Sequence, residues 1–213
     1  MIDHRKGPRL PLVARCTLIC AIALPLAAGA SVVALFLTVS ISAALRVHAP
    51  EALVFPIAGI FHGAVYGFVQ WRMLPGTNVP RRDWVFLSAL GWLAAYMALG
   101  ATNISAIASS RLDSIPGWLA SGAFGLAAGA LVGAAQSMAV STVVSKRPWI
   151  VANSLGLAIG VSLVSSLVSL VPYGQGPGEG IAQGLALILL LPLPGAAIGA
   201  STGFSILRHS LQA

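Results

Sequence analysis

A small-residue motif that recurs at a fixed spacing most constrains how this chain can fold. The motif reads Gly-Ala-x-x-Gly, and its three copies begin at Gly63, Gly129 and Gly195, 66 residues apart. Each copy lies in a long stretch of residues without charge. Recurrence at one period is typical of a chain built from internal repeats. The apolar surroundings of every copy indicate that these repeats lie in a membrane.

The composition supports a membrane protein built from helices. Of the 213 residues 57% are hydrophobic and only 8% are charged, whereas about a quarter are charged in ordinary soluble domains. The uncharged runs are 16–45, 52–71, 84–110, 114–145, 148–178 and 180–207. Each can cross the hydrocarbon core, which needs about 20 helical residues, and none alternates as barrel strands do. We therefore expect an all-α transmembrane fold of six helices, forming a single integral membrane domain over residues 1–213.

The repeat divides the six expected helices into three tandem helix hairpins. Their approximate bounds are 12–75, 82–142 and 147–208. Because every hairpin contains two spans, successive hairpins enter the membrane in the same orientation and form parallel repeats. The sequence predicts a six-helix bundle from these hairpins, and leaves open whether they close on themselves or stand in an open row.

The charges predict the orientation of the chain. The net charge is +7, and we expect one side of the membrane to receive Arg5, Lys6, Arg9, Arg15, Arg72, Arg81, Arg82, Lys146, Arg147 and Arg208. The other side receives only Arg46 and Arg111. By the positive-inside rule both termini are cytoplasmic, and residues 1–11 form a basic tail there. The basic charge thus predicts topology in a bacterial inner membrane and contact with the lipid bilayer, not a nucleic-acid partner.

The beginning of the chain also has features of a cleavable signal peptide, with Ala28-Gly29-Ala30 as a cleavage site. The apolar sequence continues to Leu45, however, and cleavage would leave a short remnant. We therefore expect an uncleaved first helix.

The motif glycines are candidates for helix packing. The pairs four residues apart are Gly63 and Gly67, Gly129 and Gly133, and Gly195 and Gly199. Small residues at this spacing let two helix backbones approach closely in lipid, where apolar association gives little drive. We expect these faces to pack inside the bundle; the rival interpretation is a lipid-facing dimerisation surface.

A polar residue follows each glycine pair by three positions, namely Gln70, Gln136 and Thr202. Such groups either hydrogen-bond between helices or line a path for a solute. Pro192 and Pro194 stand near the middle of the sixth run and predict a break in that helix. Broken helices contribute to ion and solute sites in transporters, so both prolines belong to the same candidate path.

His62 is the only ionisable side chain well inside the six runs. A hydrogen bond to a neighbouring helix is one interpretation; axial ligation of a haem or a chlorophyll-type pigment is the other. Cys16 and Cys20 are four residues apart and by themselves make too few ligands for a metal. The chain contains none of the common catalytic or metal-binding motifs, so we expect no enzyme activity and no metal.

One segment resembles a known group of proteins. Residues 63–71 read Gly-Ala-Val-Tyr-Gly-Phe-Val-Gln-Trp, and Trp84 and Leu90-Gly91-Trp92 follow. This pattern is similar to the tandem repeats of uncharacterised bacterial multi-pass membrane proteins. The resemblance covers most of residues 55–160 and weakens in the third hairpin, where Gln and Trp are lost. That group has no assigned function, so the resemblance implies architecture and no chemistry.

Three functional hypotheses follow from the sequence. Short loops and charges confined to the helix ends favour a non-enzymatic accessory or assembly subunit of a larger membrane complex. The alternative is a permeation protein for a small solute or ion that uses Gln70, Gln136, Thr202 and the Pro192–Pro194 break. The third is haem or bacteriochlorophyll-type cofactor binding through His62.

Overall fold

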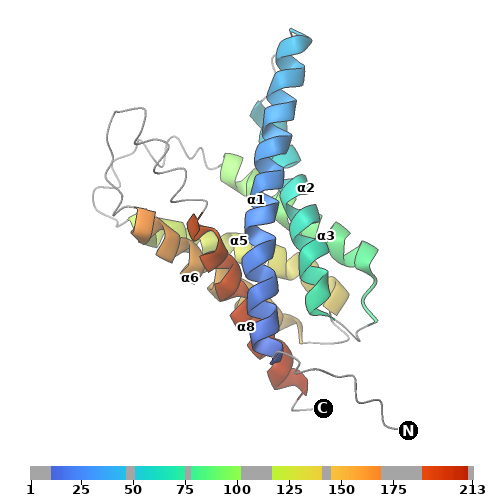
Figure 1. Ribbon diagram of the computed structural model, residues 1–213, viewed down its shortest axis with the longest axis vertical. Helices are drawn as coiled ribbons and strands as arrows, with labels where there is room; N and C mark the ends of the chain where they lie inside the picture. The colour runs from blue at the N-terminus through green and yellow to red at the C-terminus, as the bar shows by residue number, and fades with distance from the viewer. Residues whose placement is uncertain are drawn as a thin grey trace.

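The computed structural model describes residues 11–46, 51–74, 78–101, 117–140, 145–168 and 189–210. Its helices are α1 (Leu12–Ala44), α2 (Glu51–Gln70), the 3₁₀ turn η1 (Trp71–Met73), α3 (Arg81–Ala101), α5 (Gly117–Val140), α6 (Lys146–Val168) and α8 (Pro192–Ser210) (Figure 1). Strands are absent from this described part of the chain. The prediction of an all-helical fold is confirmed for it.

Among the described residues, four segments are long and apolar enough to cross a membrane. They are Leu12–Ala44, Val54–Met73, Trp118–Val140 and Lys146–Leu167. Such segments indicate a membrane protein. The sequence predicts six membrane spans, and that number stays a prediction.

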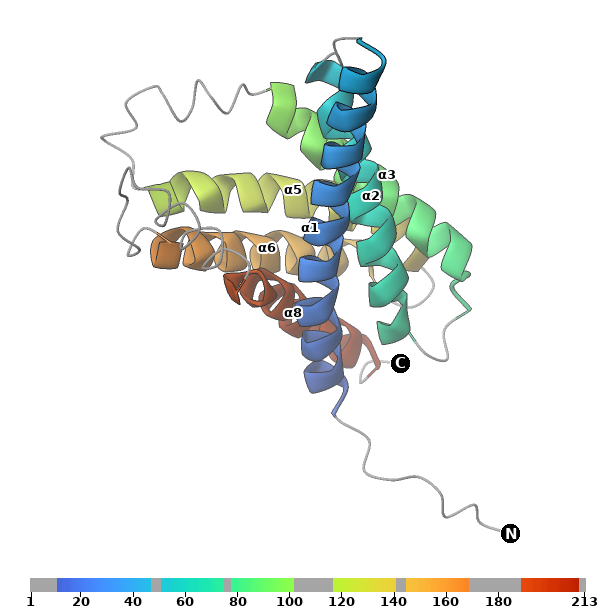
Figure 2. The same ribbon diagram turned by 45° about the horizontal axis from the view of Figure 1, so that its top comes forward.

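The six α-helices form a closed ring. Each one packs against the next in chain order, and α8 packs against α1 (Figures 1 and 2). The α8–α1 pair is antiparallel, since Gly195 lies against Cys20 and Gly203 lies against Val13. In the structure the six α-helices therefore close on themselves, whereas the sequence left open whether they would.

Helix boundaries follow the prolines. Pro80 precedes α3, and its carbonyl oxygen accepts a hydrogen bond from Trp84 N at 3.1 Å. Pro192 is the first residue of α8, after a turn at Leu191. Backbone N–H groups in the first turn of a helix have no acceptor within the helix, so a proline, which lacks an N–H, loses no hydrogen bond there. A break near Pro192 and Pro194 was predicted from the sequence, and the structure has a turn at Leu191 between the helical residues 189–190 and α8. Helix α1, by contrast, continues through Pro25.

Two clusters of buried side chains fill the ring. The first takes residues from all six α-helices: Ala23, Leu24, Ala27, Tyr66, Trp92, Ala95, Ala128, Val132, Leu157 and Ile198. The second lies at the end where α1, α3 and α6 begin: Cys16, Cys20, Met73, Leu74, Val79, Trp84, Val140 and Trp149. All six α-helices thus contribute side chains to the interior.

Trp84 and Trp149 lie inside the ring, near the starts of α3 and α6. Both are fully buried in the second cluster, and their rings meet edge to face with centroids 5.8 Å apart. The two indole rings therefore contribute a large apolar surface to the interior of the ring.

Candidate functional site

The polar residues that follow the glycine pairs lie inside the ring. Gln70, Gln136 and Thr202 are all fully buried. They come from α2, α5 and α8, which are the second helices of the three hairpins. A side-chain amide in such a place needs partners, so the hydrogen bonds around each of the three define what the site can do.

The Gln136 amide joins three helices. Its Nε2 donates to Gln70 Oε1 at 2.7 Å and to Ser88 Oγ at 2.9 Å. These bonds connect α5 to α2 and to α3. Gln136 Oε1 is buried and has no hydrogen-bond partner in the described part of the chain. The structure thus brings two of the three predicted polar residues into direct contact and leaves one acceptor unused.

The Gln70 amide extends these contacts to α1. Its Nε2 lies 3.2 Å from Tyr66 Oη and 3.8 Å from Cys20 Sγ. Cys20 Sγ in turn lies 3.1 Å from Met73 Sδ. We call the six residues Gln70, Gln136, Ser88, Tyr66, Cys20 and Met73 the amide–sulfur network. It joins α1, α2, η1, α3 and α5 through buried side chains.

Thr202 does not belong to this network. Its Oγ1 donates to two carbonyl oxygens of its own helix, Ile198 O at 2.7 Å and Gly199 O at 3.3 Å. A threonine can satisfy its hydroxyl in this way inside a helix, whereas a glutamine amide reaches further. Of the three positions that repeat in the sequence, two therefore supply amides that join helices, and the third, Thr202, hydrogen-bonds only within its own helix.

One tyrosine and two aliphatic side chains form a layer beside the three polar residues. Tyr66, Val132 and Ile198 are spaced by 66 residues, and each is at most 3% exposed. They stand four residues before Gln70, Gln136 and Thr202, one helical turn nearer the middle of the ring. These side chains belong to the first buried cluster, so the ring interior is packed at this level.

The motif glycines lie where helices of different hairpins meet. A Cβ added at Gly63 would be 2.5 Å from Ser88 O of α3, and one at Gly129 would be 2.5 Å from Asn153 O of α6. At Gly195 it would meet Cys20 O of α1. The second glycines, Gly67, Gly133 and Gly199, lie against α3, α6 and α1 in the same order. All six glycine faces are thus covered within the chain.

His62 has its own set of partners. The side chain is 5% exposed, and Nδ1 lies 3.2 Å from both Ser31 Oγ of α1 and Tyr96 Oη of α3. The Trp92 ring stacks at a centroid distance of 4.0 Å. His62 Nε2 is buried without a hydrogen-bond partner among the described residues. Ser31, Trp92 and Tyr96 fill the space beside the ring, so a tetrapyrrole bound there would require them to move.

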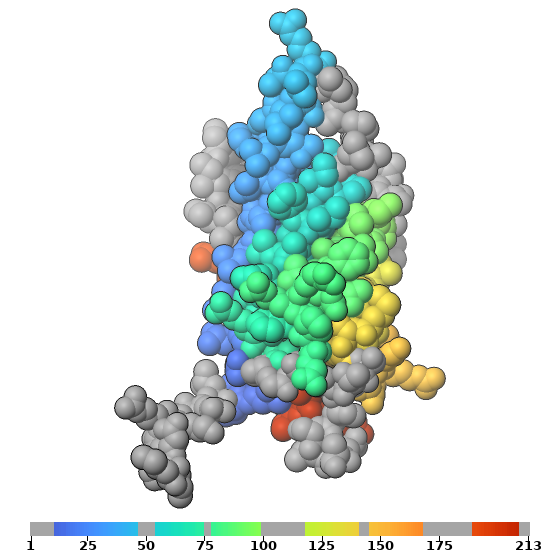
Figure 3. Space-filling view, turned by 90° about the vertical axis from the view of Figure 1, so that its right-hand side faces the viewer, coloured from blue at the N-terminus to red at the C-terminus, as the bar shows by residue number. Residues whose placement is uncertain are grey.

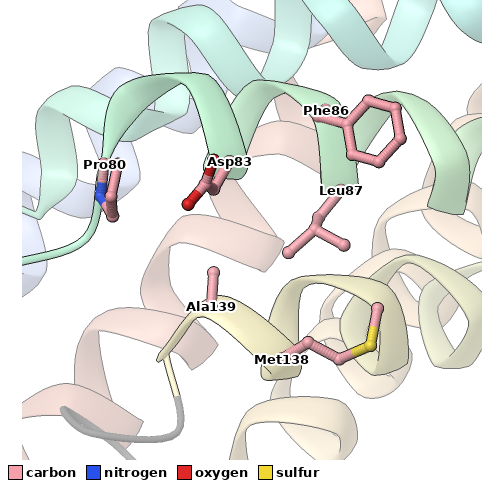
Figure 4. Close-up of a pocket in the computed structure, with 6 residues that line it drawn as sticks. All are labelled: Pro80, Asp83, Phe86, Leu87, Met138 and Ala139. Atoms are coloured by element: carbon pink, nitrogen blue, oxygen red, sulfur yellow. The ribbon is translucent and has the colours of Figure 1, made fainter.

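The outer surface carries a separate hollow between α3 and α5 (Figure 4). Its lining residues are Pro80, Asp83, Phe86, Leu87, Met138 and Ala139. Figure 4 shows Leu87 and Met138 pointing toward each other across it, with Asp83 at the end where α3 begins. This hollow faces outward, apart from the amide–sulfur network.

Comparison with known proteins adds no further assignment. No protein family, curated protein or solved structure matches this chain.

Sequence analysis missed four members of the network: Ser88, Tyr66, Cys20 and Met73. One signal was present, since Tyr66 lies inside the first glycine motif at the place of Val132 and Ile198. A phenol at a position otherwise occupied by aliphatic residues indicates a hydroxyl that needs a partner. Nothing in the sequence, however, indicated that Cys20 of α1 would lie beside it.

Proposed function

We propose that this chain is a non-enzymatic, accessory or assembly subunit of a larger complex in the bacterial inner membrane. The outer half of α1 carries the proposal, because it extends beyond the other helices that the structure describes (Figures 1 and 3). Ala34 is the last buried residue of α1, ten residues before the helix ends.

The exposed part of α1 is apolar on several sides. Phe36 is 70% exposed and Leu45 is 68% exposed. Leu37, Val39 and Ile41 are also exposed, and their spacing distributes these side chains around the helix axis. An apolar surface of this extent is typical of a contact with lipid or with another protein.

The length of α1 favours a protein contact for its outer end. Its 33 residues span about 50 Å at 1.5 Å per residue, against a hydrocarbon core of about 30 Å. To fit inside that core the helix would need to tilt by about 50°, beyond the usual range of 0 to about 40°. We infer that the outer end of α1 leaves the hydrocarbon and is covered by a helix of a partner subunit.

Site-specific photo-crosslinking in native membranes tests this proposal. A photoreactive residue replaces Phe36 or Leu45 on α1, and the matched control replaces Phe86 or Met138, which are 61% and 58% exposed elsewhere. We expect the two α1 positions to crosslink to the same protein, which also co-purifies stoichiometrically in mild detergent. Recovery of the chain alone, or equal crosslinking from all four positions, would contradict the proposal.

We further propose that the chain crosses the membrane six times as three parallel hairpins, with both termini cytoplasmic. Because neighbouring helices are antiparallel, α1, α3 and α6 begin at the same end of the ring at which α2, α5 and α8 end. That end carries Arg15, Arg72, Arg81, Arg82, Lys146, Arg147 and Arg208. Such a concentration of cations is typical of the cytoplasmic face. The resemblance to bacterial multi-pass proteins with tandem glycine repeats accords with this arrangement.

The amide–sulfur network favours a second candidate, a permeation protein for a small solute or ion. The supporting observation is the unpaired Gln136 Oε1, a buried acceptor next to the Gln70 amide. In this proposal the packed ring is a closed state, and a polar solute passes Gln70 and Gln136 when the ring opens. Replacing both residues by leucine would then abolish flux into liposomes while the protein still folds. Unchanged flux would remove both amides from any transport mechanism.

A further inference from the structure

The beginning of α3 presents two hollows on the outer surface, one on each side of Phe86. The α2-side groove lies between α2 and α3 and includes Phe68, Arg81, Arg82, Val85 and Ala89. The α5-side groove is the hollow of Figure 4, and both grooves share Pro80 and Phe86. Figure 3 shows this face of the molecule, where α2, α3 and α5 lie side by side.

Two cations stand at the end of the α2-side groove. The Arg81 guanidinium lies over the Phe68 ring, 5.3 Å from its centroid. A cation over an aromatic face is attracted to it, so this contact holds the guanidinium beside the groove. The Arg82 side chain is 93% exposed, and its Nε lies 3.5 Å from Asp83 Oδ1. Because an ion pair this exposed is weak, Arg82 can exchange Asp83 for a stronger anionic partner.

Apart from Asp83 where the α5-side groove begins, the remaining lining side chains of both grooves are apolar. Phe68 is 46% exposed and Phe86 is 61% exposed. Val85 and Ala89 follow the arginines along α3 toward the middle of the ring. On the other side of Phe86, Leu87 and Met138 continue the apolar surface. Positive charge at one end, with apolar grooves running away from it, matches the division of a phospholipid into headgroup and acyl chains.

We propose that the beginning of α3 binds a diacyl phospholipid with an anionic headgroup. Arg81 and Arg82 hold the phosphate, and the two acyl chains lie in the two grooves, separated by Phe86. Arginine suits this role because its planar donors match phosphate oxygens. Basic pockets between membrane helices on the cytoplasmic side bind anionic headgroups in this way. Asp83 lies on the α5 side, so its charge favours placing the phosphate on the α2 side.

The start of α6 supplies a matched control within the same chain. Arg81-Arg82-Asp83-Trp84 corresponds to Lys146-Arg147-Pro148-Trp149, with two adjacent cations in both segments. The contact between α5 and α6 corresponds to that between α2 and α3, and at the positions that match Phe68 and Phe86 it has Ala134 and Val151. The α6 start therefore has the charge without the two aromatic side chains, and the proposal predicts no selective lipid site there.

Native mass spectrometry of the purified protein in detergent, titrated with phosphatidylglycerol or phosphatidylcholine, tests the headgroup. We expect selective retention of phosphatidylglycerol. Arg81→Gln with Arg82→Gln should weaken its binding by about thirtyfold, since each cation near an anionic surface contributes about fivefold. Lys146→Gln with Arg147→Gln should change it by less than about twofold. Equal losses in the two double variants, or retention of both lipids alike, would overturn the proposal.

The acyl chains are tested with lysophosphatidylglycerol, which has one chain, and with glycerol 3-phosphate, which has none. We expect diacyl phosphatidylglycerol to bind most strongly, and Phe86→Ala to weaken it without changing the melting temperature. Equal binding of all three ligands would show a simple anion site and overturn the lipid assignment. All four arginine and lysine positions are exposed, so the variants should fold, and their elution and melting temperatures verify this.

Discussion

Gly63 shows how a single hydrogen atom can determine the spacing of two helices. The nearest neighbours of an added Cβ are Ser88 O at 2.5 Å and Ala89 Cα at 2.6 Å, both backbone atoms of α3. Backbone atoms cannot rotate away as a flexible side chain can. An added methyl group must therefore separate α2 from α3, and the contacts beside it are lost as well.

The first prediction compares Gly63→Ala with Gly29→Ala. The Gly63 variant should lower the free energy of unfolding by about 1–3 kcal/mol, as overpacking in a core does. At Gly29 an added Cβ meets nothing within 4 Å, so alanine should raise the same quantity by about 0.5–1 kcal/mol through its better helix propensity. Reversible unfolding in mixed micelles measures both, and opposite signs are the expected result. Equal effects would contradict the close contact.

The second prediction compares Gln136→Leu with Thr202→Val. Gln136 bonds to Gln70 and Ser88 on other helices, whereas Thr202 bonds only to carbonyls of α8. Gln136→Leu should therefore cost about 0.6–2 kcal/mol of unfolding free energy, the range for interhelical hydrogen bonds in membranes. Thr202→Val, which keeps the side-chain shape, should change it by less than about 0.5 kcal/mol because no interhelical bond is lost. A larger loss of unfolding free energy in Thr202→Val would indicate that the Thr202 hydroxyl also bonds to another helix.

For individual residues, the sequence predicted which polar side chains are buried more successfully than it predicted which residues they hydrogen-bond to. The 66-residue spacing singled out Gln70 and Gln136, but it treated Thr202 as their equal. His62 was expected to meet a neighbouring helix, yet neither Ser31 nor Tyr96 could be named. Such pairs depend on the rotation and relative height of two helices, which a one-dimensional period does not determine.

At the scale of elements, the closure of the ring rests on the contact between α8 and α1. The repeat explains why α8 uses its glycines as α2 and α5 do, since each second helix presents the same face to a first helix. For α2 and α5 the partner is the next helix along the chain, whereas for α8 it is the first one. Only three-dimensional closure supplies that partner, and for this reason sequence alone left an open row of hairpins as an alternative.

The third prediction is a disulfide across this contact in the Gly203→Cys variant. A Cβ at position 203 would lie 3.1 Å from Cys16 Cβ and 3.5 Å from Cys16 Sγ. Disulfides have Cβ–Cβ distances of about 3.5–4.5 Å, so a shift of a few tenths of an ångström suffices. Mild oxidation in the membrane should produce an intramolecular disulfide, identified by mass spectrometry as a linked peptide pair.

Two controls accompany the disulfide experiment. Adding Cys16→Ser to Gly203→Cys should abolish the link, and Gly29→Cys alone should form none, because nothing lies within 4 Å of that position. Crosslinks between separate chains without an intramolecular product would indicate an open row of hairpins and contradict the closed ring.

The helix boundaries were the part of the fold most accessible from sequence. Hairpins predicted to start near residues 12, 82 and 147 correspond to helices that begin at Leu12, Arg81 and Lys146. Charged residues and prolines mark these boundaries, and both act through local chemistry. Pro192 shows the limit of that reasoning, since the same residue type bends a helix in its middle but begins one at its first turn.

At the scale of the whole molecule, the distribution of charge predicts how the ring sits in the membrane. The chain has only two lysines, Lys6 and Lys146. Lys146 begins α6 at the cation-rich end of the ring, whereas Arg46 follows α1 at the opposite end. If the cation-rich end is cytoplasmic, both lysine amines face the cytoplasm and no lysine faces the other side.

The fourth prediction uses this distribution without disturbing the fold. A membrane-impermeant amine reagent should leave Lys146 unlabelled in intact cells and label it in inside-out vesicles. The Arg46→Lys variant keeps the charge and places one amine at the opposite end, so it should become labelled at position 46 in intact cells. Peptide mass spectrometry locates each label. Labelling of Lys146 from outside the cell would reverse the orientation. Labelling of both positions from the same side would contradict a first helix that crosses the membrane, because α1 alone separates Arg46 from the cation-rich end.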